Sequence, residues 1–205
     1  MRKCFIVLTV ILFVSSGLMA QDKKMHRVRL GYGLKTGMNY THFYLNNLKD
    51  ALDQRFDRSW RTGFVFGGFV TVPVYKQFSI QPEFLYSSMG GDYTTDQQDN
   101  VRARYNYFSI PVTAKYKVCR KIALLVGPQF DFLIQGKEST NGGKFKVSDD
   151  LKDYDIAVTA GFEFWPTRHI VLQARYMKGF NDIDFRPNMV RYYNEGVQAT
   201  FGVKF

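Results

Sequence analysis

Three histidines and two cysteines are the side chains best suited to nucleophilic, acid–base or metal chemistry in this 205-residue chain. His26, His42 and His169 lack the convergent spacing that metal ligands need. Cys119 lies beside Arg120 and could be a reactive thiol, although an ordinary turn residue also explains it. No motif ties a serine and an acid to His42, as a hydrolase would require. The sequence therefore predicts no catalytic residue, no metal site and no cofactor.

Two acidic clusters could hold Ca²⁺, because oxygen-rich loops supply the ligands that this ion prefers. The clusters are Asp149, Asp150, Asp153 and Asp155, and then Asn181, Asp182 and Asp184. Neither cluster has a complete ligand pattern, so solvated loops are the simpler interpretation.

The first twenty residues have the layout of a secretory signal peptide. Arg2 and Lys3 precede an apolar run over residues 5–14, and small residues lead up to Gln21. A membrane helix is the alternative, but the run is short for a bilayer span. We predict a signal peptide over residues 1–20 and a single domain over residues 21–205.

Charge and composition limit what the exported chain can be. The net charge of +10 falls to about +8 without Arg2 and Lys3. For an exported protein, an anionic lipid surface is a better partner than nucleic acid. Only Cys119 remains beyond residue 20, so disulfides do not hold the fold together. No later apolar run approaches the length of a membrane helix, so a membrane location requires a closed barrel.

Apolar and polar residues alternate with a period of two in eight segments, which predicts eight strands. The expected strands cover residues 28–40, 61–74, 78–89, 105–116, 122–134, 154–165, 170–180 and 196–205. The connections alternate between short turns (75–77, 117–121 and 166–169) and long loops (41–60, 90–104, 135–153 and 181–195). This rhythm predicts an all-β fold, an eight-stranded antiparallel up-and-down transmembrane β-barrel with both ends on the periplasmic side.

Alternation alone does not say which face is inside, and a soluble lipocalin-like barrel would turn its apolar face inward. Glycines on the polar face favour a crowded polar lumen, since solvent-facing strands do not need them. Aromatic residues near the strand ends suit interfacial girdles, and Phe205 closes the last strand as an insertion signal. The expected interior charges are Arg29, Lys35, Lys115, Arg175 and Lys204 with Glu83, Asp131, Asp155 and Glu163.

These interior charges are nearly balanced, so they can form a paired network that closes the lumen to solutes. Gln81, Gln129, Gln173 and Gln198 can bridge the remaining gaps. In the first loop, Leu45, Leu48, Leu52 and Phe56 have near-helical spacing. A short helix over the barrel mouth and a docking helix for a partner both explain that spacing.

Six stretches of the chain resemble the PorT-like outer-membrane β-barrel domain family of Bacteroidetes. They are residues 30–39 (LGYGLKTGMN), 78–86 (FSIQPEFLY), 110–116 (IPVTAKY), 125–130 (LVGPQF), 157–164 (AVTAGFEF) and 174–180 (ARYMKGF). The resemblance implies a barrel in the outer membrane of a Gram-negative bacterium. Some members of that family are associated with type IX secretion, but no residue here marks that role.

The expected function is structural or interactive and not enzymatic. The expected partners are outer-membrane lipid and lipopolysaccharide, the barrel-assembly machinery and a protein partner bound through the loops, with the barrel itself a monomer. The alternative is a small outer-membrane enzyme that modifies lipid, in which His42 would be the only histidine in an outer loop.

Overall fold

The computed structural model describes residues 30–45, 60–94, 100–140, 143–146, 154–180 and 192–205. The strands are β1 (Gly31–Leu45), β2 (Arg61–Tyr75), β3 (Phe78–Thr94), β4 (Asn100–Lys117), β5 (Ile122–Thr140), β6 (Gly143–Lys146), β7 (Tyr154–Phe164), β8 (Ile170–Gly179) and β9 (Tyr192–Lys204). No helix in this part of the chain has the length and apolar character to cross a bilayer.

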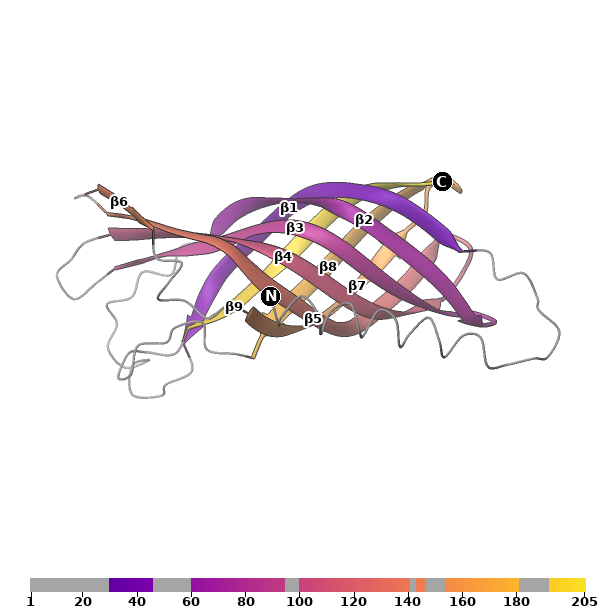
Figure 1. The fold of residues 1–205 in the computed structure, drawn as a ribbon. Coiled ribbons are helices and arrows are strands. Elements are labelled where there is room, and N and C mark those ends of the chain that lie inside the picture. The colour runs from indigo at the N-terminus through magenta and orange to yellow at the C-terminus, as the bar shows by residue number, and fades with distance from the viewer. Residues whose placement is uncertain (1–29, 46–59, 95–99, 141–142, 147–153, 181–191) are drawn as a thin grey trace, which may run out of the picture.

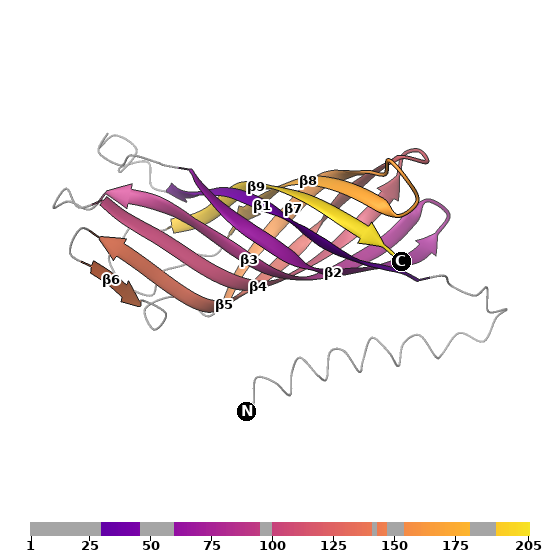
Figure 2. The same cartoon turned by 90° about the horizontal axis from the view of Figure 1, so that it is seen from above.

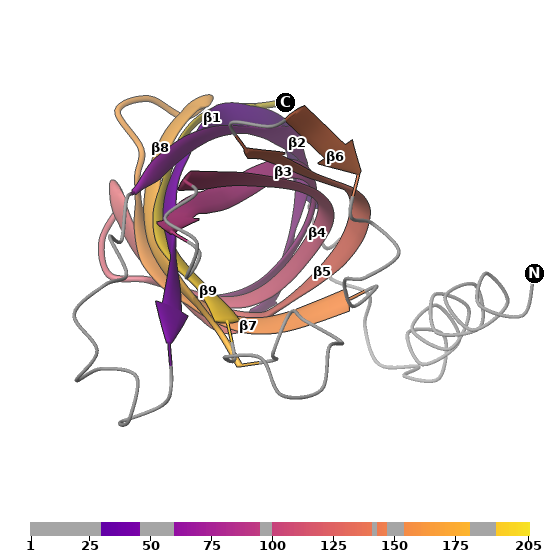
Figure 3. The ribbon, with the colours of Figure 1, turned by 90° about the vertical axis from the view of Figure 1, so that its left-hand side faces the viewer.

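Eight strands close into one antiparallel barrel (Figures 1 and 3). Consecutive strands pair along the chain, and β1 pairs with β9 from Gly33↔Lys204 to Leu45↔Tyr192 to complete the ring. Because every strand of the ring has two neighbours, no backbone edge is left unpaired in the wall. The predicted fold class, an eight-stranded antiparallel barrel, is confirmed.

The three short turns and the C-terminus lie at one end of the barrel, which we call the short-turn end (Figures 1 and 2). The β2–β3 turn is the tightest and includes Lys76, whose φ of 42° is left-handed. The opposite end, from which the long connections leave, is called the loop end. The strand ends at the short-turn end match the predicted turns closely.

At the loop end the strands are longer than predicted. Thr41 to Leu45 continue β1, so Leu45 belongs to a strand and not to a helix. The ends of the predicted loops 90–104 and 135–153 are also strand, because β3, β4 and β5 extend as one sheet to Thr94, Asn100 and Thr140. The ninth strand, β6, pairs only with the end of β5 and stays outside the ring. β3, β4 and β5 are longer than the roughly ten residues that a strand needs to cross a bilayer, so the sheet that they form projects beyond the rest of the barrel.

The outer face of the barrel is apolar and exposed. Leu34, Phe66 and Val126 are between 50% and 60% exposed, although a soluble protein would bury such residues. Aromatic pairs lie near both ends of this face. Phe78 packs on Tyr116 at the short-turn end, with ring centroids 4.8 Å apart, and Tyr40 stacks on Trp60 at the loop end at 4.7 Å. These rings suit the interfacial girdles of a membrane barrel.

The inner face carries most of the buried polar side chains but is not wholly polar. Phe69 is 2% exposed and points into the lumen opposite Gly33 of β1. A Cβ on Gly33 would lie 2.6 Å from the Phe69 ring and closer still to the Val203 carbonyl oxygen, so only glycine leaves room there. Towards the loop end, Met89, Tyr105 and Met177 form part of a buried apolar cluster inside the barrel.

Several predictions fall outside the described residues. These are the signal peptide over residues 1–20, the lumen position of Arg29, most of the first-loop helix and both acidic clusters apart from Asp155. They remain predictions.

Candidate functional site in the barrel interior

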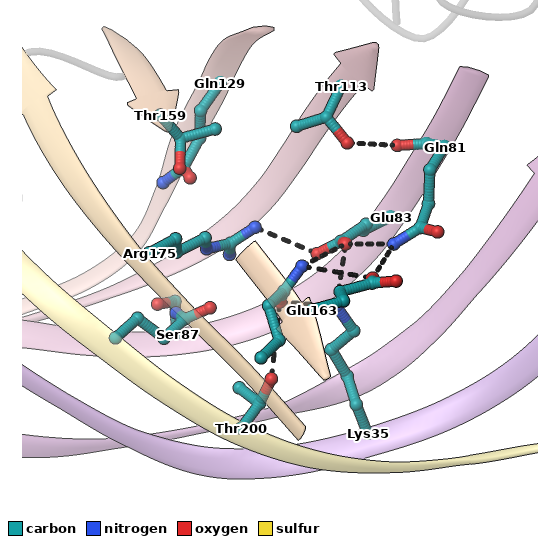
Figure 4. A network of polar contacts seen from close by, with 12 residues as sticks. Lys35, Gln81, Glu83, Ser87, Thr113, Gln129, Thr159, Glu163, Arg175 and Thr200 are labelled. Carbon is teal, nitrogen blue, oxygen red and sulfur yellow. Dashed lines mark hydrogen bonds and ion pairs between the residues drawn. The ribbon is translucent and has the colours of Figure 1, made fainter. Parts of the chain in front are cut away.

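The carboxylate of Glu83 is the centre of a buried polar network (Figure 4). Its Oε1 atom lies 2.7 Å from Nζ of Lys35, and its Oε2 atom accepts a hydrogen bond from Nη1 of Arg175 at 2.9 Å. Gln81 also donates to Oε1, at 3.0 Å. The Glu83 side chain is fully buried. A buried carboxylate is stable only when it is paired and hydrogen-bonded, and Glu83 meets both conditions.

Glu163 is the second carboxylate of this network. It forms an ion pair with Lys115 and accepts a hydrogen bond from Nε2 of Gln81 at 2.7 Å. The indole Nε1 of Trp165 donates to its other oxygen at 3.1 Å. Gln81 therefore joins the two carboxylates through one amide nitrogen.

The alternation of strand residues brings these side chains together from distant parts of the chain. Successive side chains point to opposite faces, so each strand sends every second residue inward. Lys35 on β1 donates to Gln173 on β8 at 2.8 Å although 138 positions separate them. We call Lys35, Gln81, Glu83, Lys115, Glu163, Gln173 and Arg175 the central network; its members come from β1, β3, β4, β7 and β8.

The contact between Glu83 and Arg175 spans the lumen. In the ring, β2, β1 and β9 lie between β3 and β8 on one side, and β4, β5 and β7 lie between them on the other. The two residues are thus on opposite walls. Because their side chains meet, the central network spans the lumen from one wall to the other at this level.

Smaller polar groups continue towards the loop end. Asn39 donates to Ser87 at 2.8 Å and accepts a hydrogen bond from Gln198 at 2.6 Å. Asp131 accepts two hydrogen bonds from Gln129, at 3.0 and 2.9 Å. The four predicted glutamines therefore all lie in the interior, where Gln81 and Gln173 bridge charged groups.

The predicted interior charges do not all join the central network. Lys35, Glu83, Lys115, Glu163 and Arg175 belong to it, whereas Asp131 and Asp155 are buried nearer the loop end. Asp155 contacts Asn194, whose amide lies 3.4 Å from it. Lys204 is only half-buried at the short-turn end, where its ammonium lies 5.9 Å from the centre of the Trp165 ring.

Trp165 and Phe69 are interior residues that the sequence analysis did not assign. Both place an aromatic ring beside a lysine: Nζ of Lys115 lies 4.7 Å from the Trp165 ring centre, and Nζ of Lys35 lies 5.3 Å from that of Phe69. Such cation–π contacts stabilise desolvated ammonium groups. Phe69 could have been recognised from the sequence, because it is an apolar residue at a position where the period-two pattern expects a polar one.

The residues considered for other chemistry lie elsewhere. His42 is on the outer side of β1, where its ring packs edge-on against Trp60 at 4.1 Å. Cys119 is an exposed free thiol in the β4–β5 turn. Within the described ranges, no group of three or more His, Cys, Asp or Glu side chains could hold a metal ion.

Comparison with known proteins agrees with this architecture. The profile of the outer membrane protein beta-barrel domain family matches residues 19–184. No curated protein sequence matches the chain at a significant level.

Two solved structures illustrate the likeness. The attachment invasion locus protein Ail of Yersinia pestis is 13% identical, with a TM-score of 0.51 over 85% of this chain and 98% of Ail. Neisserial surface protein A is 10% identical, with a TM-score of 0.54 over 85% of this chain and 97% of that protein. At these identities the likeness shows a shared fold.

Proposed function

Since the chain belongs to the family of outer membrane protein β-barrel domains, and so lies in the outer membrane of a Gram-negative bacterium, we propose that it is a non-enzymatic barrel that interacts through its loop end. In this proposal the barrel is monomeric and carries no solute. Residues 1–20 are removed on export, and residues 21–205 are assembled by the barrel-assembly machinery.

The observation that supports a closed barrel is the contact between Glu83 and Arg175 across the lumen. Eight strands leave an interior just wide enough for side chains to fill. Here the filling side chains are charged and bonded to one another, so moving them aside would break buried ion pairs. Opening a path for solutes would therefore require the free energy of breaking these ion pairs, whereas a structural role leaves the network intact.

The loop end offers a surface for an interacting partner. There, β3, β4 and β5 extend beyond the other strands of the ring, and β6 widens this sheet (Figure 1). With the short-turn end in the periplasm, this sheet faces outward from the cell. The resemblance to PorT-like barrels makes a secretion-associated role one candidate function of this protein.

Lipopolysaccharide is the partner that the side chains of this sheet favour most. Arg104 of β4 and Lys137 of β5 are exposed on its outer side and directly opposite each other. The other register partner of Arg104 is Gly90, which has no side chain to balance the charge. Like charges directly opposite each other in a sheet are destabilising, and a phosphate between them would remove that repulsion.

Depth in the membrane agrees with this assignment. Nearer the barrel on the same face, Phe108 and Phe132 lie opposite each other and are about two-fifths exposed. A cationic pair just beyond an aromatic pair suits a lipid whose acyl chains contact the rings and whose phosphates contact the cations. We therefore propose that Arg104 and Lys137 bind the phosphates of lipid A.

Binding of purified lipopolysaccharide to the detergent-solubilised protein tests this proposal. Arg104→Gln/Lys137→Gln should weaken binding by about tenfold, because two solvent-exposed ion pairs with the lipid are lost. Lys23→Gln/Lys24→Gln removes the same charge from the segment that precedes β1, outside both proposed anion sites, and should leave binding unchanged. Equal weakening by both variants would mean that net charge alone attracts the lipid, and the proposed site would be wrong.

A further inference from the structure

The short-turn end carries charge of only one sign in its turns. The β2–β3 turn has Lys76, the β4–β5 turn has Arg120 and Lys121, and the β7–β8 turn has Arg168. No aspartate or glutamate occurs in residues 75–77, 117–121 or 165–169. The whole chain has 18 acidic residues, so their absence from all three turns is a feature of this end rather than of the composition.

These turns surround a pocket of about 590 Å³ at the mouth of the barrel. Its walls include inward-facing Gly31, Thr71, Ser79 and Ala123, so the pocket opens inside the ring of strands. Its cationic lining consists of Lys76, Lys117, Arg120, Lys121, Arg168 and Lys204, together with Lys115 at its base, and no carboxylate lines it. We call this pocket the basic mouth.

The charges of the basic mouth differ from those of the central network because they are not compensated. Lys115 is paired with Glu163, the nearest acid of the network, whose other contacts are Gln81 and Trp165. In the part of the chain that the structure describes, none of the six other cations forms an ion pair with a carboxylate. Several uncompensated cations around one concave site generate a positive potential that attracts anions.

We propose that the basic mouth is a binding site for a soluble multivalent oxyanion, a small molecule that carries several phosphate or carboxylate groups. Arg120 and Arg168 can each hold such a group through two parallel hydrogen bonds, and the lysines add point charges around them. The pocket volume lies within the range typical of small-molecule sites. Because the pocket opens within the strand ring, phospholipid headgroups around the outer wall do not face it.

Calorimetric titration of the full protein with sodium tripolyphosphate, in a detergent with an uncharged headgroup, tests this site. The wild-type protein should bind one tripolyphosphate, and citrate should compete for the same site. Arg120→Gln/Arg168→Gln should weaken tripolyphosphate binding by about tenfold, since two solvent-exposed ion pairs with the ligand are lost. Both residues are exposed in turns, so the variant should refold normally.

The matched control is Lys144→Gln/Lys146→Gln in β6, which removes two charges at the opposite end of the molecule and should leave binding unchanged. Lack of saturable binding by the wild-type protein, or equal weakening in both variants, would overturn the proposal. Short-chain dihexanoyl phosphatidylglycerol distinguishes the source of the anion: it should fail to displace tripolyphosphate. Displacement would assign the mouth to a lipid headgroup and contradict the soluble ligand.

Discussion

Glu83 and Arg175 meet across the middle of the barrel, with Oε2 of the carboxylate 2.9 Å from Nη1 of the guanidinium, although they lie 92 positions apart in the sequence. The same carboxylate lies 2.7 Å from Nζ of Lys35. One buried anion therefore compensates two buried cations on different strands. Backbone hydrogen bonds between strands stabilise the barrel wall, and the contacts of Glu83 with Lys35 and Arg175 stabilise its interior.

Glu83→Gln should be among the most destabilising single substitutions in the lumen. It would leave Lys35 and Arg175 buried without their shared carboxylate, and breaking a buried pair in this way typically costs about 3–5 kcal/mol. Urea unfolding of the protein in lipid vesicles, followed by tryptophan fluorescence, measures this loss. Glu195→Gln makes the same chemical change on the outer face, beside Tyr176, and should cost less than about 1 kcal/mol. Equal losses in the two variants would contradict the central position of Glu83.

The period-two pattern was sufficient to predict the barrel and the side to which most residues point. Lys35, Glu83 and Arg175 were assigned inward because each lies on the polar face of a strand whose other face is mostly apolar, and closure of the ring leaves only one interior for them. Their pairing could not be predicted, because which residues meet across the lumen depends on the stagger of all eight strands. That stagger is a property of the closed barrel and not of any one segment.

The length of the strands at the loop end was underestimated for a related reason. Arg102, Arg104 and Lys137 fall within the predicted loops 90–104 and 135–153, beyond the segments in which apolar and polar residues alternate. In the structure they are strand residues beyond the aromatic pair of Phe108 and Phe132, where the outer face no longer needs to be apolar. A register shift between β4 and β5 near Asn106 also interrupts the alternation that a sequence pattern follows.

Deletion of Phe205 should impair assembly more than the conservative substitution Lys204→Arg. The amide of Phe205 donates to the carbonyl oxygen of Tyr32 at 2.9 Å, and the two rings lie 6.0 Å apart, at the seam where β1 and β9 close the barrel. Loss of this residue removes the last contacts of the seam as well as the predicted insertion signal. The fraction of heat-modifiable protein in outer membranes measures assembly, and equal fractions for the deletion and Lys204→Arg would refute this prediction.

The refolded protein should not turn over lipid. The lipid-modifying alternative depends on His42, whose ring packs against Trp60 on the outer side of β1. Incubation with radiolabelled phospholipid or lipid A, followed by chromatography of the products, checks this expectation. Turnover by the wild-type protein that disappears in His42→Ala would establish the enzymatic alternative in place of the proposed function.

Planar-bilayer recording of the pure wild-type protein tests most directly whether the lumen is closed. The contact between Glu83 and Arg175 spans the lumen at its middle, and the apolar cluster that includes Met89, Tyr105 and Met177 is buried inside it nearer the loop end. With both barriers in place, the protein should insert without producing stable conductance steps, at neutral pH and at either polarity. Reproducible single-channel conductance from the wild-type protein would contradict the closed, network-filled barrel.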